Sequence, residues 1–148
     1  MNLKKTVLFL LTILLLFNSF DLWTQGKKIS KDPVLKPQEK LVVLWTSGNR
    51  DTAIKMVFMY TFNSKKFKWW KDITLIVWGP SAKLLSEDNE LQDYMKKIIN
   101  SGITVKACKA CSDMYGVSKK LSEIGVIVKY MGVELTNFIK EGRHILTL

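Results

Sequence analysis

The chain has few of the residues that build common catalytic and metal sites. Its 148 residues include two cysteines and one histidine, His144. A structural zinc site needs four ligands, and these residues would supply only three. The sequence also contains no Ser-His-Asp order and no paired-carboxylate motif. We therefore predict no metal site, and the two cysteines become the main candidates for chemistry.

Arginine is also scarce, although the chain is strongly basic. The formal net charge is +10, but arginine occurs only at Arg50 and Arg143. Lysines supply the charge, in groups at residues 65–71, 96–97 and 119–120. A basic surface can attract nucleic acid or an anionic membrane. No helix-turn-helix, RNA-binding or zinc-finger pattern accompanies the charge, so we interpret the lysines as a solvated surface and predict no nucleic-acid partner.

No nucleotide-binding motif stands out. The stretch TSGNRDT, residues 46–52, leads from a predicted strand into a helix N-terminus, where a phosphate can bind. It lacks the spacing of a Walker loop and the glycines of a Rossmann fingerprint. We predict no bound cofactor.

The long apolar run of the chain lies at its N-terminus. The positive head MNLKK precedes TVLFLLTILLLF, a run of 12 residues that is short for a membrane span and typical of a secretory signal. The next residues contain no Ala-x-Ala pattern and no cysteine for lipidation. We predict a signal peptide or an uncleaved membrane anchor at residues 1–26, then a polar linker at residues 27–40. The protein would be exported, either periplasmic or membrane-anchored.

Strands and helices are predicted to alternate after the linker. Short apolar runs predict strands near residues 41–45, 72–80, 103–108, 126–131 and 144–148, and helical spacing separates them. This order indicates an α/β fold, a flavodoxin-like doubly wound sandwich with a five-stranded, mainly parallel sheet. The stretch KWWKD, with Trp69 and Trp70, leads into the second strand, and we interpret both rings as packing or subunit contacts.

The predicted topology places the cysteines at an edge where such folds bind ligands. In open α/β sheets the ligand lies beyond the carboxyl ends of the strands, where the strand order reverses. In the flavodoxin-like order this crevice lies between the first and third strands. Cys108 begins the loop after the third strand, and we expect it to face residues from the loops after the first and second strands, namely Thr46, Ser47, Gly48, Gly79 and Ser81.

Cys108 and Cys111 form a Cys-x-x-Cys pair, the spacing that thioredoxin-type proteins use for disulfide exchange. Unpaired N–H groups and the helix dipole at a strand-to-helix junction stabilise a thiolate. Lys106 and Lys109 add positive charge nearby, so we expect a lowered thiol pKa at this junction. Cys108 would be the nucleophile, and Cys111 would resolve an adduct on it.

Three other interpretations of the pair remain open at this point. The cysteines could form a structural disulfide, although so short a loop gains little from a cross-link. They could supply half of a zinc site together with His144. They could also be inert buried thiols, because free cysteine is often a small core residue.

Three stretches resemble the DsrE/DsrF-like family of small sulfur-handling proteins: VWGPSAKLL, NSGITVKACKACSDMYGV and VKYMGVELTNFI. The resemblance runs from about Leu41 to Leu148, and we expect these residues to form a DsrE-like domain. It is strongest to the branch with a Cys-x-x-Cys-x-Asp-x-Tyr-Gly-Val stretch, which is carried here by Cys108, Cys111, Asp113, Tyr115, Gly116 and Val117.

The resemblance implies a flavodoxin-like fold, a homotrimer or homohexamer, and a persulfide on one cysteine. In the family that cysteine lies eight residues before a Gly-Val pair, and Cys108 occupies this place relative to Gly116. Relay members of the family are cytosolic, so the predicted export argues against tRNA thiolation. We therefore expect a sulfur carrier with partner proteins that donate and accept sulfur. The alternatives are a thiol–disulfide redox protein and a non-enzymatic oligomeric module that binds a small ligand.

Overall fold

The computed structural model describes residues 39–148. The predicted signal peptide or anchor (1–26) and all but the last two residues of the predicted linker (27–40) lie outside the described residues. The described chain forms a five-stranded sheet in which all pairs are parallel, with the strand order β4-β3-β2-β1-β5. The strands are β1 (Lys40–Trp45), β2 (Asp72–Val77), β3 (Thr104–Cys108), β4 (Ile127–Lys129) and β5 (His144–Thr147).

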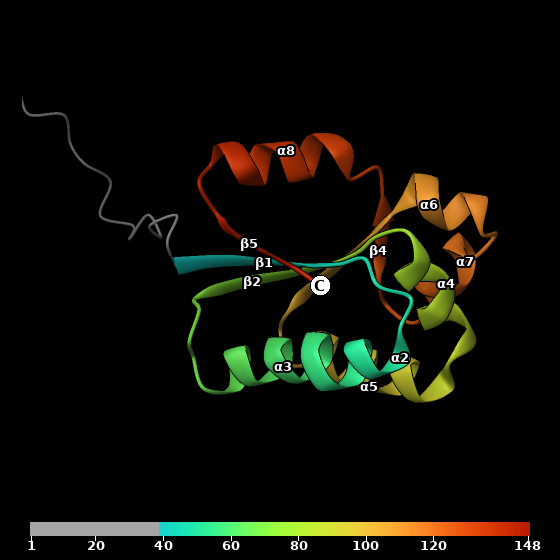
Figure 1. Cartoon of the computed structure of the whole chain (residues 1–148), viewed down its shortest axis with the longest axis horizontal. Helices are drawn as coiled ribbons and strands as arrows, with labels where there is room; N and C mark the ends of the chain where they lie inside the picture. Colours follow the sequence, from blue (N-terminus) through green and yellow to red (C-terminus); the bar gives the residue numbers. More distant parts are fainter. Residues whose placement is uncertain (1–38) are drawn as a thin grey trace, which may run out of the picture. The chain divides into compact units, whose positions relative to one another are not determined.

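Helices cover both faces of this sheet. Figure 1 shows α8 on one face, and α3 and α5 on the other. The helices are α2 (Arg50–Thr52), the π-helix η2 (Ala53–Phe58), α3 (Met59–Lys66), α4 (Pro80–Glu87), α5 (Asn89–Asn100), α6 (Lys109–Met114), α7 (Ser118–Glu123) and α8 (Gly132–Lys140). None of the helices within residues 39–148 is both long and apolar enough to cross a membrane. The predicted α/β doubly wound fold is confirmed.

The two faces carry separate apolar clusters of unequal size. The larger one lies under α3 and α5 and contains the largest buried rings, Trp45 and Phe58, which pack edge to face with centroids 5.1 Å apart. The smaller one lies under α8 and contains Val42, Ile76, Cys108, Met131 and Phe138. Because side chains alternate along a strand, Val105 and Ala107 join the larger cluster, while Cys108 faces α8.

The segment after Cys108 contains two short helices. Helix α6 begins directly at Lys109, and a break at Gly116 separates it from α7. Gly116 has φ +68°, a left-handed conformation that ends a helix and favours glycine. The strand predicted at 126–131 is also shorter, because β4 is an edge strand that spans Ile127–Lys129.

The prediction of a crevice between the first and third strands is wrong. Strand β2 lies between β1 and β3, so the loops after β1 and β3 are not neighbours. The chain adds β2, β3 and β4 in succession on one side of β1, and only β5 crosses to the other side. The loop after β2 is therefore the natural partner of the cysteines, and Gly79 lies in it.

Candidate functional site

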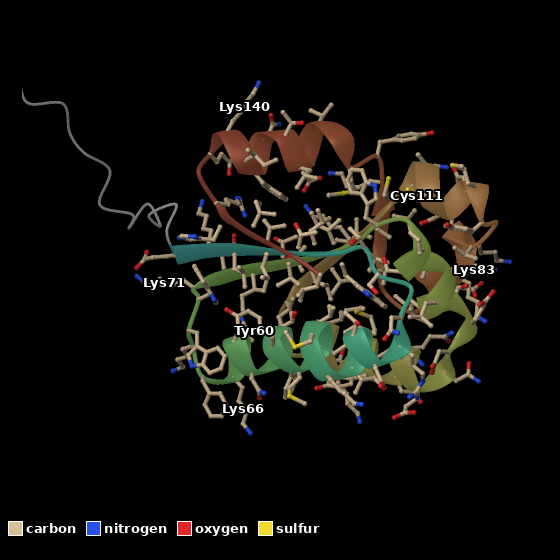
Figure 2. The ribbon with its side chains drawn as sticks, in the orientation of Figure 1. Tyr60, Lys66, Lys71, Lys83, Cys111 and Lys140 are labelled. Carbon is tan, nitrogen blue, oxygen red and sulfur yellow. The ribbon has the colours of Figure 1, made fainter. Side chains whose placement is uncertain are left out.

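Both cysteines lie at the carboxyl end of β3, where the strand passes into α6. Cys108 is the last residue of β3, and Cys111 lies in α6. Cys108 is only 4% exposed, whereas Cys111 is half-buried, and both thiols are free. Figure 2 shows Cys111 at the end of the domain far from Lys66 and Lys71. Cys111 is therefore the thiol that a molecule in solution meets first.

The two thiols lie close together. The Cys108 thiol and the backbone N–H of Gly79 both lie near enough to the Cys111 sulfur to act on its pKa. Burial raises the pKa of the Cys111 thiol, and the neighbouring Cys108 thiol raises it further, while the Gly79 N–H acts in the opposite direction. For Cys111 the expected lowering of the thiol pKa is therefore wrong.

The surroundings of the thiols explain this direction. Cys111 packs with Trp78 against the apolar cluster that contains Cys108 and Met131. The Ser112 hydroxyl next to Cys111 donates a hydrogen bond to the Cys108 carbonyl oxygen at 2.9 Å. This hydroxyl is therefore already paired within the protein. Apolar packing removes water that would solvate a thiolate, so the neutral thiol is favoured.

The two lysines expected to add positive charge are each paired with a carboxylate. Lys106 forms an ion pair with Glu134 of α8, and Lys109 forms one with Asp113. The Lys109 ammonium also lies over the Tyr130 ring, 5.7 Å from its centroid. Each pair largely cancels the local field, which removes the electrostatic reason for a stabilised thiolate.

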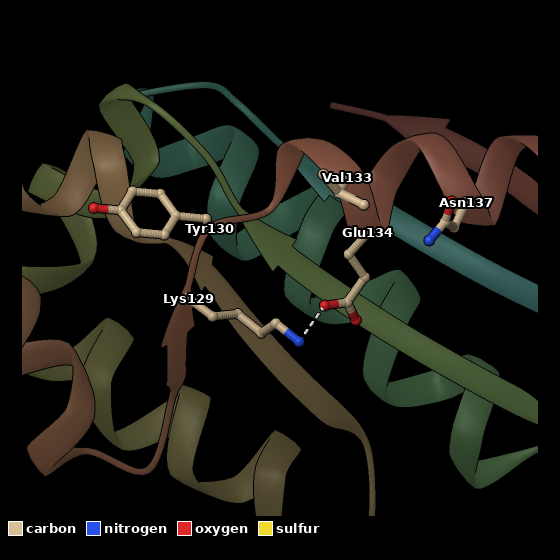
Figure 3. A pocket seen from close by; sticks show the side chains of 5 residues that line it. All are labelled: Lys129, Tyr130, Val133, Glu134 and Asn137. Carbon is tan, nitrogen blue, oxygen red and sulfur yellow. Dashed lines mark ion pairs between the residues drawn. The ribbon is translucent and has the colours of Figure 1, made fainter.

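A pocket of about 330 Å³ lies beside β4, next to the strand that carries Cys108. It is lined by Lys129, Tyr130, Val133, Glu134 and Asn137 (Figure 3). Burial acts to raise the pKa of Glu134, but hydrogen bonds from Lys106 and Lys129 outweigh it and hold this pKa below its usual value. Figure 3 shows the Tyr130 ring pointing away from the Lys129–Glu134 ion pair. The pocket is therefore polar on the side of the ion pair.

Two of the predicted substrate-binding residues, Thr46 and Ser47, lie in the loop after β1. Thr46 donates to the main-chain oxygen of Leu148 through its N–H (2.7 Å) and its hydroxyl (3.1 Å), and the N–H of Ser47 donates to the same oxygen at 3.3 Å. These bonds tie the loop after β1 to the end of β5. Ligand binding by Thr46 and Ser47 stays a prediction.

The other three predicted residues, Gly48, Gly79 and Ser81, lie in the loop after β1 and at the start of the segment after β2. A Cβ atom on Gly48 would lie 3.2 Å from the Cβ of Pro80, which follows Gly79. Gly79 itself contacts Cys111, and its φ of +68° suits glycine. Ser81 is fully buried, and its hydroxyl bonds the backbone of Trp45 and Trp78. The structure thus brings Gly79 to the cysteines and shows a structural role for Ser81, while ligand binding by these residues stays a prediction.

His144 lies at the opposite edge of the sheet. It is the first residue of β5, whereas Cys108 is the last residue of β3, and the strands are parallel. His144 contacts the Trp70 ring, with centroids 5.0 Å apart. The half-zinc interpretation that combined the cysteines with His144 is therefore wrong. Within residues 39–148 no group of three or more His, Cys, Asp or Glu side chains is placed to hold a metal ion.

Sequence reasoning missed four residues around the thiols: Trp78, Tyr130, Met131 and Glu134. Trp78 follows β2, and Tyr130 and Met131 follow β4. The rule that parallel strands end at one edge would have found all three. Glu134 had a weaker signal, because Lys106 is a charged residue inside an apolar strand and such a charge needs a partner.

The fold and the site define a class of protein: a small parallel α/β domain with a free thiol pair at the carboxyl edge of its sheet. The chain belongs to the DsrE/DsrF-like family, because the sequence model of that family matches residues 39–148. Its membership of a branch defined by the Cys-x-x-Cys stretch stays a prediction.

The solved structures that are similar to this chain include a Bacteroides protein and an E. coli protein. A conserved protein of unknown function from Bacteroides thetaiotaomicron is 42% identical with a TM-score of 0.72, covering 74% of this chain and 95% of that one. The ychN protein from E. coli has a TM-score of 0.58 at 18% identity, covering 75% of this chain and 99% of that one, and this likeness shows the fold alone. No curated protein matches the chain.

The raised pKa of Cys111 leads to a prediction about its neighbour. Replacing Cys108 with alanine should lower the pKa of Cys111, because the Cys108 thiol is one cause of the rise. The pKa should stay above the ordinary thiol value, because burial remains. The pH dependence of alkylation of Cys111 by iodoacetamide measures this change. Met114→Ala, an exposed position on the same helix, should leave the pKa unchanged; an unchanged or higher pKa in Cys108→Ala would contradict the prediction.

Proposed function

We propose that this domain is a sulfur carrier that holds sulfane sulfur as a persulfide on Cys108, with Cys111 as the resolving thiol. The observation that carries the proposal is the closeness of two free thiols at the carboxyl edge of the sheet. Family membership supports it, because sulfur handling is the chemistry that the resemblance implies. Gly79 would hold the resolving sulfur through its N–H.

The proposed reaction has two steps that balance in sulfur and in electrons. First, the Cys108 thiolate attacks the outer sulfur of a donor persulfide, forms a Cys108 persulfide and releases the donor as a thiolate. Second, the Cys111 thiolate attacks the inner sulfur, forms the Cys108–Cys111 disulfide and expels hydrosulfide. A dithiol reductant must then restore both thiols. Because Cys108 is 4% exposed, the first step requires the layer above it to open.

A second candidate function is thiol–disulfide exchange without sulfur transfer. The difference in exposure favours it, because a half-exposed thiol beside a buried one is the arrangement in which one sulfur attacks a partner and the other resolves the mixed disulfide. In this case Cys111 would attack first, and Cys108 would resolve. The roles of the two cysteines would then be reversed.

Intact mass measurement tests the proposal. Residues 39–148 are incubated with a low-molecular-weight persulfide and weighed before and after reduction. The expected result is a reducible gain of one sulfur atom in the wild type and none in Cys108→Ser. Undiminished loading of Cys108→Ser would overturn the proposal. A loss of two hydrogens with no release of hydrosulfide would favour the second candidate, because the sulfur carrier forms the same disulfide only as it expels hydrosulfide.

We also propose that the protein is exported and works as a homo-oligomer. The apolar run at residues 6–17 supports export, periplasmic or membrane-anchored, and cell fractionation tests it. Exposed apolar side chains near the site support assembly, because a contact between copies would cover them. They are Met114, Ile127, Tyr130 and Val133. Light scattering of residues 39–148 tests for a trimer or hexamer, and a monomer would contradict it.

A further inference from the structure

The loop between α3 and β2 carries an unusual mixture of exposed rings and lysines. Its sequence, residues 65–71, is KKFKWWK. The Phe67 and Trp69 side chains are 57% and 56% exposed, and their rings stack with centroids 5.8 Å apart. The earlier packing interpretation fits Trp70, which is half-buried and donates to the Tyr60 hydroxyl at 3.3 Å. Packing does not fit the exposed Trp69, and a subunit contact there stays a prediction. We name residues 65–71 the basic aromatic loop.

Apolar surface continues from this loop onto the adjoining helix. Met56 and Met59 are 53% and 48% exposed on η2 and α3. Together with Trp69 they line a groove of about 230 Å³, whose other walls are Lys55, Tyr60 and Asn63. Exposed rings and methionines that adjoin one another are costly in water and indicate a surface that contacts something apolar.

The lysines of the loop surround a second hollow. Lys65, Lys68, Lys71 and Trp70 line a pocket of about 320 Å³. Among the described residues, Lys65, Lys66 and Lys68 form no ion pair with a carboxylate, and the Lys66 ammonium lies over the Phe67 ring, 5.4 Å from its centroid. Three positive charges therefore remain available to an anionic partner, beside rings that are also exposed.

The position of the loop suggests what that partner is. The N–H of Lys71 donates to the Glu39 carbonyl oxygen at 3.1 Å, and their side chains form an ion pair at 2.5 Å. The loop is therefore adjacent to the residue through which the preceding chain, with its apolar run at residues 6–17, is joined to the sheet. Figure 2 shows Lys66 and Lys71 at the end of the domain far from Cys111.

We propose that the basic aromatic loop, with Met56 and Met59, binds the surface of a lipid bilayer that contains anionic lipids. Tryptophan and phenylalanine favour the headgroup region of a bilayer, and methionine adds apolar area. Lysines near the surface gain from the negative potential of anionic lipids. The domain would then present its thiols on the side that faces away from the bilayer.

Vesicle sedimentation tests the proposal with residues 39–148, which lack the apolar run. A solved relative consists almost entirely of this domain, so the fragment is a folding unit. The fragment should bind vesicles of equal phosphatidylcholine and phosphatidylglycerol, bind poorly to phosphatidylcholine alone, and be released by salt. Lys66→Gln with Lys68→Gln should weaken binding about tenfold to thirtyfold, and Phe67→Ser with Trp69→Ser about tenfold.

Matched controls separate this surface from general charge and apolarity. Lys119→Gln with Lys120→Gln removes the same charge from α7, and Tyr115→Ser with Ile139→Ser removes exposed apolar groups from the end of α6 and from α8. Both controls should bind vesicles as the wild type does, and circular dichroism checks the fold of every variant. No binding, equal binding to neutral vesicles, or equal losses in the controls would overturn the proposal. Binding of a single-stranded oligonucleotide through the same lysines, without vesicle binding, would also overturn it.

Discussion

Replacing Cys111 with serine should trap sulfur on Cys108. The wild type, once loaded and freed of donor, should expel hydrosulfide and form the Cys108–Cys111 disulfide. In Cys111→Ser the internal nucleophile is absent, and release should slow by more than about a hundredfold, because groups held in contact react far faster than free ones. The two thiols lie near enough for Cys108 to act on the pKa of Cys111. Sulfide release, measured colorimetrically, and intact mass follow the reaction.

Acidity gives this experiment a second readout. Because burial and Cys108 raise the pKa of Cys111, its thiolate fraction is small at neutral pH and grows as the pH rises through and above the ordinary thiol range. Release from the wild type should therefore accelerate with pH, and release from Cys111→Ser should not. Met114→Ala provides the matched control on the same helix. Equal release from Cys111→Ser and the wild type would rule out a resolving role for Cys111.

Replacing Glu134 with glutamine should lower the free energy of unfolding by about 2–3 kcal/mol at neutral pH. The Lys106 and Glu134 side chains are 17% and 16% exposed, and Lys129 pairs with the second oxygen of the same carboxylate at 2.6 Å. Glutamine keeps the shape but leaves two ammonium groups without a counter-charge, one of them largely buried. Because Lys106 lies on β3 and Glu134 on α8, the loss weakens the contact that covers Cys108. Urea unfolding measures the change.

The pH dependence of this effect has a definite sign. The pKa of Glu134 is lower in the folded protein than in the unfolded chain, whose glutamate pKa is about 4.3. Its stabilising contribution is therefore fully present above the unfolded pKa and is lost as the pH falls through the folded pKa. The difference between the wild type and Glu134→Gln should shrink accordingly at acid pH.

An exposed ion pair supplies the control for Glu134. Glu123 pairs with Lys119 at 3.9 Å, and their side chains are 60% and 93% exposed. Surface pairs of this kind contribute little, so Glu123→Gln should change the free energy of unfolding by less than about 0.5 kcal/mol. If the two variants had equal effects, the Lys106–Glu134 contact would not be a special determinant of stability.

Local patterns predicted much of the fold. Apolar runs located all five strands, and helical spacing located the segments between them, such as η2, where Val57 and Phe58 are fully buried. Cys108 was correctly placed at the end of the third strand because an apolar run ended there. These features depend on neighbours in the sequence, and so a single sequence is enough to reveal them.

Features that depend on contacts between distant segments were not predicted. The strand order was assumed, so the loop after β1 was expected next to the loop after β3, whereas Gly79 in the loop after β2 lies beside Cys111. The Ser81 hydroxyl is satisfied by backbone from two strand ends, which no local pattern shows. Lys106 was expected to act on the thiols, yet Glu134, 28 residues later, neutralises it. In each case the decisive partner lies far away along the chain.

The unequal covering of the two sheet faces affects how often Cys108 meets solvent. Helix α8 buries one of its side chains, Phe138, whereas α5 buries four. Elements with few buried contacts open locally at a lower free energy than global unfolding. Brief detachment of α8 would uncover Cys108 in a minor population of otherwise folded molecules, and that population would then set the rate at which sulfur reaches the buried thiol.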